Sequence, residues 1–115
     1  TKNKSLDQYL MELGKPPRLT LEEEVALAKR VQEGDDSALT EIVNANLRLV
    51  VSEGKRHINQ GLSTEELIEE GTRGLVLAAK KYYNSRRFQF IPYALWWIHQ
   101  SMQQAIKDTE TQNKG

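Results

Sequence analysis

Residues 92–104 read PYALWWIHQSMQQ, and this stretch places both tryptophans of the chain side by side in a segment with helical periodicity. Pro92 suits the first position of a helix, because the amide hydrogen that proline lacks has no partner there. At about 100° per residue, one arc of this helix is apolar, which favours packing on a core. That arc comprises Ala94, Leu95, Ile98, Met102, Ala105 and Ile106. We therefore predict a helix over 92–107.

The opposite arc of this helix carries aromatic and amide side chains. Its members are Tyr93, Trp96, Trp97, Gln100, Gln103 and Gln104. Two interpretations are open: a second element covers the rings, with Trp97 partly in the core, or the rings form an exposed platform. An exposed platform of flat rings suits stacking on nucleic-acid bases, and glutamine side chains suit hydrogen bonds to base edges.

The composition excludes several classes of protein. A length of 115 residues suits one domain with a hydrophobic core, and the absence of cysteine excludes disulfides and thiolate metal sites. No apolar run is long enough to span a bilayer, so we expect a cytoplasmic protein with no membrane partner. We also expect the isolated chain to be a monomer. His57 and His99 lack the spacing of a ligand pair, and no nucleophile motif or phosphate-binding loop occurs. We therefore predict no catalytic residue, no metal and no cofactor.

Charge is distributed unevenly along a chain whose formal net charge is zero. Fourteen of the sixteen carboxylates lie in residues 1–70, whereas residues 71–107 contain none and hold seven of the eight aromatic residues. A basic segment interleaved with aromatic side chains is typical of single-stranded nucleic-acid binding, although any one lysine is more simply interpreted as part of a solvated face. From this segment we add Lys81, Phe88 and Gln89 to the candidate DNA contacts.

Capping and stop signals divide the chain into about five helices. Three capping boxes begin at Ser5, Thr20 and Ser63. Asp35 or Asp36 caps a long third helix that ends at Gly61, and residues 84–87 break the fourth helix. We predict an all-α, compact helical domain with short loops. Its parts are N-terminal helices over 5–33, a core over 36–107 that contains the helix 92–107, and a frayed polar tail over 108–115.

Five blocks of the sequence, in order, resemble the central domain of bacterial housekeeping sigma factors of the sigma-70 type. They are SLDQYLMELG (5–14), LTLEEEVALAKRVQEGD (19–35), NANLRLVVS (44–52), NQGLSTEELIEEGTRGL (59–75) and FQFIPYALWWIHQS (88–101). NLRLVVS and YALWWIHQS are the most specific of these motifs. The resemblance covers residues 5–106, corresponds to regions 1.2 to 2.4, and is closest to the primary sigma factors of Bacteroidetes-like bacteria.

The resemblance implies that the domain docks on core RNA polymerase and recognises the promoter −10 element. In that family the non-template strand is held single-stranded and two of its bases are flipped into pockets. Tyr93 matches the tyrosine that stacks on the flipped adenine. Trp96 and Trp97 match the pair at the upstream edge of the bubble, and Gln100 matches the glutamine that reads the last duplex pair there.

Other residues match functional positions of the same family. Tyr82 and Arg86 match positions of the adenine pocket, and Asn46 and Leu49 match positions of the second base pocket. Leu10 and Met11 match positions that contact the strand just downstream. Glu66, Glu69 and Glu70 match the helix that docks on the clamp coiled coil of the largest polymerase subunits. From the residues alone, simpler interpretations stay open. Asn46 could be a hydrogen-bonded core amide, Leu49 could be a core residue, and the glutamates could form a solvated helix face.

The chain also departs from the family's pattern near the proposed DNA contacts. Pro92 stands where Ser or Thr is usual, Gln89 where Lys is usual, and His99 where Arg is usual. Each lost phosphate contact lowers the salt dependence of binding by roughly one unit of slope. These departures favour an alternative in which the chain is an engineered, phage-encoded or regulatory polymerase-interaction module with altered or lost promoter specificity. A third class, an enzyme, would need an ionisable pair in a cleft, and the sequence indicates none.

Overall fold

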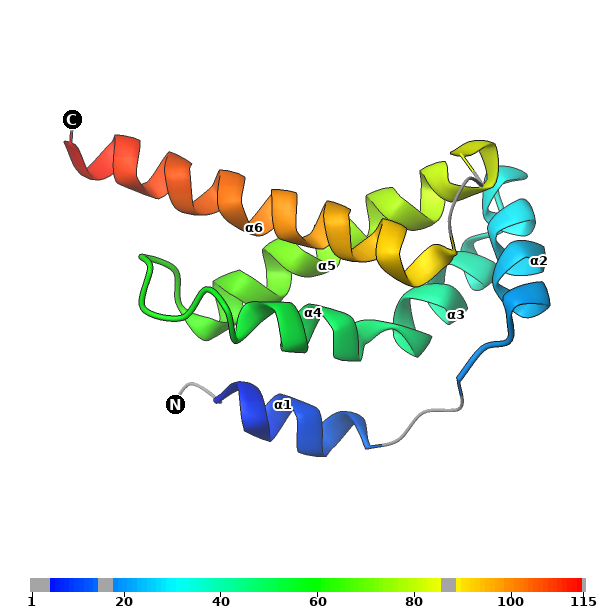
Figure 1. The fold of residues 1–115 in the computed structure, drawn as a ribbon, viewed down its shortest axis with the longest axis horizontal. Helices are drawn as coiled ribbons and strands as arrows, with labels where there is room; N and C mark the ends of the chain where they lie inside the picture. The colour runs from blue at the N-terminus through cyan, green and yellow to red at the C-terminus, as the bar shows by residue number, and fades with distance from the viewer. Residues whose placement is uncertain (1–4, 15–17, 86–88, 115) are drawn as a thin grey trace.

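The computed structural model describes residues 5–14, 18–85 and 89–114, with side chains up to residue 112, and these ranges are helical with connecting turns (Figure 1). The elements are α1 (Leu6–Leu13), α2 (Leu21–Gln32), α3 (Asp36–Ala45), α4 (Leu47–Gly54), α5 (Thr64–Lys81), the 3-10 turn η1 (Tyr82–Ser85) and α6 (Phe90–Lys114). The predicted all-α fold is confirmed, with six α-helices in the described residues where about five were expected. None of these described helices is both long enough and apolar enough to cross a membrane.

The predicted helix starts form as local hydrogen-bonded caps. In all three capping boxes the hydroxyl accepts from the backbone N–H three residues on, and the Gln or Glu there accepts from the N–H of the cap. The N-cap of α3 is Asp35 and not Asp36, because the carboxylate of Asp35 accepts from the N–H groups of Ser37 and Ala38. These caps satisfy donors that each helix leaves unpaired at its first turn.

The predicted long third helix is wrong, because the chain breaks at Asn46 into α3 and α4. Asn46 has φ −120° and ψ 10°, outside helical values, and its buried side chain donates to the carbonyl of Ile42 at 2.8 Å. A side chain that takes a backbone acceptor competes with the helical ladder, which accounts for the break. The second piece also ends earlier than expected, at Gly54, and a turn continues to Gly61.

α6 differs from the predicted helix 92–107 at both ends. It begins at Phe90, whose fully buried ring fixes the first turn in the core. It continues to Lys114, beyond the predicted end at residue 107, and fraying of the last turns stays a prediction. Side-chain hydrogen bonds four residues apart accompany these added turns, as between Gln104 and Asp108 at 2.9 Å. The C-terminal part of α6 projects beyond the other helices (Figure 1).

α5 and α6 run side by side and form the main packing pair of the domain (Figure 1). The apolar arc predicted for α6 faces this core, since Ala94, Ile98, Met102 and Ile106 are buried. The remaining arc members, Leu95 and Ala105, are only partly buried. Two glycines of α5, Gly71 and Gly74, lie against α6 with no room for a side chain. The contact therefore fixes both the spacing of the two helices and the orientation of the opposite, aromatic arc of α6.

Candidate nucleic-acid interface

A chain of aromatic rings leads from the core to the surface at the N-terminal half of α6. Tyr82 and Phe90 are buried and meet edge to face, with ring centroids 5.2 Å apart. Tyr93 lies 5.5 Å from Tyr82 and 6.3 Å from Trp97, and Trp97 lies 5.3 Å from Trp96 (centroid distances). Trp96 is 58% exposed. We call Tyr93, Trp96 and Trp97 the aromatic surface.

Both interpretations of these rings hold in part. Tyr93 and Trp97 are partly buried and pack against the core cluster, whereas Trp96 is open to solvent. The ammonium of Lys81 lies 5.7 Å from the ring centroid of Trp97, a cation–π contact that sets positive charge beside the rings. The aromatic surface thus packs against the core on one side and lies next to the ammonium group of Lys81. This arrangement suits stacked bases next to phosphates.

The other predicted DNA contacts differ in their exposure to solvent. Gln100 is exposed within one turn of both tryptophans, and Gln103 is exposed one turn further along. Tyr82, by contrast, is only 4% exposed and supports the ring of Tyr93 from the core, and its place in the adenine pocket stays a prediction. Arg86 and Phe88 lie outside the described residues.

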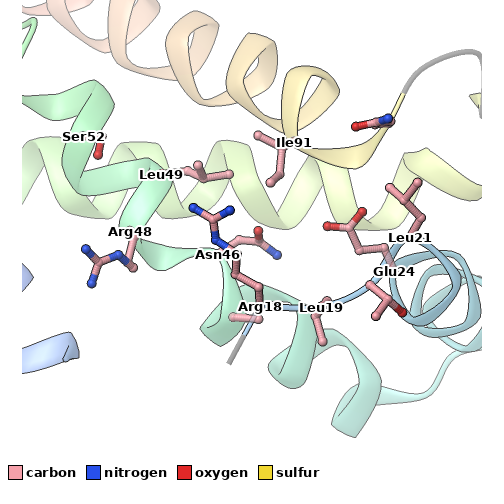
Figure 2. Close-up of a pocket in the computed structure, with 12 residues that line it drawn as sticks. Arg18, Leu19, Leu21, Glu24, Asn46, Arg48, Leu49, Ser52 and Ile91 are labelled. Carbon is pink, nitrogen blue, oxygen red and sulfur yellow. The ribbon is translucent and has the colours of Figure 1, made fainter. Parts of the chain in front are cut away.

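A pocket of about 810 Å³ brings Asn46 and Leu49 together with Gln89, which directly precedes α6 (Figure 2). The other lining residues are Arg18, Leu19, Thr20, Leu21, Glu24, Ala45, Arg48, Ser52 and Ile91. Its wall is mixed: leucine and isoleucine side chains alternate with amide, hydroxyl and guanidinium groups. Its volume lies within the roughly 300–1,000 Å³ that small-molecule pockets occupy.

Charge in this pocket is also mixed. Figure 2 shows Arg18 and Asn46 on one side of the pocket and Glu24 reaching in from α2. Burial raises the pKa of Glu24, which favours its uncharged form. Arg48 donates to the backbone carbonyl of Gly14 and thereby ties α4 to the end of α1. Sequence reasoning missed Arg18, Glu24 and Ser52, because no local pattern joins these three segments.

Leu10 and Met11 lie on α1, which runs beside α4 (Figure 1). Met11 is 81% exposed, and Leu10 is partly buried. Neither residue lines the pocket or belongs to the aromatic surface. Their predicted contact with the strand is thus a separate patch on the N-terminal helix.

The three predicted polymerase-docking residues lie together in a second, smaller hollow of about 280 Å³ between α5 and the C-terminal half of α6. We call Glu66, Glu69, Glu70 and Asp108, which all line it, the acidic groove. Glu66 also completes the cap at the start of α5, where it accepts from the backbone N–H of Ser63 at 2.8 Å. The acidic groove and the aromatic surface lie toward opposite ends of the α5–α6 pair.

Three titratable side chains that the sequence analysis did not group meet between α4 and α6. One carboxylate oxygen of Glu53, Oε2, accepts from His57 Nε2 at 3.0 Å and from His99 Nδ1 at 2.7 Å. Burial by itself raises the pKa of Glu53, but the hydrogen bonds from His99 and His57 outweigh it and hold the pKa below its usual value. The four-residue spacing of Glu53 and His57 was a signal for two of the three members of this cluster. No local pattern in the sequence pointed to the third member, His99 on α6.

Comparison with known proteins gives matches along nearly the whole chain. Residues 5–37 match the family model "Sigma-70 factor, region 1.2", and residues 42–111 match "Sigma-70 region 2". The RNA polymerase sigma factor SigA of a Bacillus species is 43% identical over 106 residues, 92% of this chain and 28% of that protein. The RNA polymerase sigma factor SigA of Clostridium acetobutylicum is 47% identical over 100 residues, 87% of this chain and 26% of that protein. The chain thus spans little more than a quarter of the length of these relatives.

Proposed function

Because this chain belongs to the sigma-70 family of RNA polymerase sigma factors, we propose that it reads the promoter −10 element as single-stranded non-template DNA and docks on core RNA polymerase in the cytoplasm. The predicted resemblance to sigma factors is confirmed, while the particular closeness to Bacteroidetes-like bacteria stays a prediction. Sigma factors are transcription initiation factors and not enzymes, which agrees with the prediction of no catalytic residue.

The observation that carries the DNA proposal is the supported but open aromatic surface. An exposed indole at the end of a chain of packed rings offers a flat apolar face to a partner, and flat rings suit nucleobases of any sequence. Trp96 offers such a face, while Tyr93 and Trp97 are held by core contacts. Because these rings are already oriented, binding orders few side chains, which lowers its entropic cost.

The pocket supports capture of a second base. Gln89 and Ile91 line it, and Tyr93, the first residue of the aromatic surface, follows Ile91 by two residues in α6. A single strand that follows the start of α6 would therefore meet both features in succession. Asn46 and Leu49 provide an amide and an apolar wall, the combination that reads a base edge and covers a base face.

Tyr93→Ala is expected to weaken binding of a single-stranded −10 oligonucleotide by about 1–3 kcal/mol, the range for one stacked base. Tyr93→Phe keeps the ring and is the matched control, with an affinity close to that of the parent chain. Fluorescence anisotropy measures both, and circular dichroism verifies the fold. A folded Tyr93→Ala variant with parental affinity would remove Tyr93 from the interface.

The strand state of the DNA tests the proposal as a whole. Flipping bases from a duplex costs a few kcal/mol each, and a domain of zero net charge has little general attraction to phosphates with which to offset that cost. We expect measurable binding to the single non-template strand and much weaker binding to the matching duplex. Substituting the adenine assigned to Tyr93 should cost at least about 1 kcal/mol, since a pocket reads the base edge as well as its face.

Anisotropy titrations with three probes decide this test: the single strand, its adenine-substituted form and the duplex. Equal affinity for all three would indicate a nonspecific charged surface and would contradict base capture. The acidic groove favours one second candidate, a polymerase-interaction module that has lost promoter reading. That candidate predicts polymerase binding without measurable affinity for any of the three probes.

A further inference from the structure

We propose that Glu53, His57 and His99 form a binding site for a divalent transition-metal ion, with Zn²⁺ as the best fit, that ties the end of α4 to α6. The site lies outside the aromatic surface, the pocket and the acidic groove. It is the only His-containing group of possible metal ligands within the described residues.

The geometry of the three ligand atoms suits a tetrahedral ion. Glu53, His57 and His99 each offer one possible ligand atom, and these three atoms all lie within 4.8 Å of one another. Zinc binds imidazole nitrogen and carboxylate oxygen at about 2.0–2.2 Å, so two of its ligands in tetrahedral geometry lie roughly 3.3 Å apart. Glu53 Oε2 lies 3.0 Å from Nε2 of His57 and 2.7 Å from Nδ1 of His99. These two separations need to open by about 0.3 Å and about 0.6 Å to reach that spacing.

The chemistry of the donor set favours zinc over magnesium or calcium. Two imidazoles and one carboxylate form a borderline-soft set that zinc and its transition-metal neighbours prefer, whereas magnesium and calcium take oxygen ligands. An ion here would take the place of the protons that join the two rings to Glu53. His57 would then carry its remaining proton on Nδ1, which lies 3.4 Å from the carbonyl oxygen Oε1 of Gln60. Such an outer acceptor fixes the ring of a metal-bound histidine.

The surroundings provide both shielding and access. The side chains of His57 and Glu53 are only 5% and 7% exposed, so competing water is largely excluded. The side chain of His99 is 36% exposed and leaves one side open for the ion to enter and for a fourth ligand. Arg56 lies 3.9 Å from the other oxygen of Glu53, but it is 75% exposed, so solvent screens its repulsion of a cation.

Isothermal titration calorimetry of the chelator-treated 115-residue chain with Zn²⁺ tests the site, with Mg²⁺ as the control ion. We expect saturation at one Zn²⁺ per chain and no saturable Mg²⁺ binding. Co²⁺, used as a spectroscopic probe, should give the intense visible absorption of four-coordinate geometry. Zn²⁺ should also raise the midpoint of thermal unfolding of the parent chain, because an ion that binds only the folded state stabilises it.

Variants distinguish the site from adventitious binding. His99→Ala should weaken Zn²⁺ binding more than about 100-fold, beyond the 10–100-fold of an outer-shell partner, and should abolish the thermal shift. Gln104→Ala, an exposed change on the same helix, should bind as the parent chain does. Glu53→Gln has nearly the same shape, keeps an acceptor for the rings, and decides the matter if His99→Ala does not fold. Parental Zn²⁺ affinity in a folded His99→Ala or Glu53→Gln variant, or no one-to-one saturation of the parent, overturns the proposal.

Discussion

Replacing Gly74 with alanine should lower the free energy of unfolding by about 1–3 kcal/mol, the usual cost of overpacking a core. A Cβ at this position would lie 2.6 Å from the carbonyl oxygen of Trp97 and 3.0 Å from the Cα of Ile98. Both atoms are backbone, so α5 and α6 must separate to admit the methyl group. Helix propensity predicts the opposite sign, since alanine is favoured over glycine by roughly 0.5–1 kcal/mol inside a helix.

Gly54→Ala provides the matched control. It is also a buried helical glycine, but its Cβ would meet only side-chain atoms at ordinary van der Waals distances, the two methyls of Leu6 at 3.5 and 3.6 Å and Cε of Met102 at 3.8 Å. We expect this variant to be as stable as the parent chain or slightly more stable. Urea unfolding followed by circular dichroism measures both. Equal stability of the Gly74→Ala variant and the parent would show that the helix contact is looser than described.

The Gly74→Ala variant has a second expected effect, because Trp97 lies directly across the contact. Separation of the helices would shift the backbone that carries the aromatic surface. Affinity for the single-stranded −10 oligonucleotide should therefore fall in the Gly74→Ala variant even under conditions where it remains folded. Gly54→Ala should leave that affinity unchanged.

A charge change in the acidic groove, Glu66→Gln with Glu69→Lys, should abolish detectable binding to core RNA polymerase. A like charge placed against a complementary surface costs several kcal/mol, enough to lose a complex of moderate affinity. Glutamine is chosen at position 66 because it can still complete the cap with Ser63, so the helix start is kept. Oligonucleotide binding should persist, because the acidic groove and the aromatic surface lie toward opposite ends of the α5–α6 pair.

Glu33→Gln with Glu41→Lys is the control for net charge, because it changes the charge equally at exposed positions outside the groove. This control should bind polymerase as the parent chain does. The measurement is a pull-down on immobilised core polymerase, with anisotropy on the oligonucleotide in parallel. Recovery of the groove variant at the parental level would contradict the docking assignment and leave the DNA proposal intact.

The helices were predictable where their signals are local. Ser5, Thr20 and Ser63 cap helices through hydrogen bonds that reach only three residues along the chain, so the sequence contains both partners. The two arcs of α6 likewise follow from periodicity alone. Its apolar arc supplies buried residues, and its opposite arc supplies the exposed ring of Trp96.

Errors arose where packing competes with local pattern. Asn46 has an apolar neighbourhood that suits an unbroken helix, but its buried amide bonds to Ile42 and ends α3. Tyr82 fits two roles by sequence, a core position at the end of α5 and a DNA contact. The structure buries it against Tyr93, which confirms the core position, and the DNA contact stays a prediction. α6 begins at Phe90, a residue that is buried in the core. No capping residue in the sequence indicates this start.

By itself the sequence determined the helix starts, the apolar face of the last helix, the segregation of acidic residues from aromatic ones, and the family. Each of these depends on residues close in the chain or on composition. Only the tertiary structure decided which rings stay open, which residues share the pocket with Asn46, and that His99 meets Glu53 and His57. Those groupings join segments far apart in sequence, and their distances follow from how closely α6 packs on α5 and α4, which no local pattern encodes.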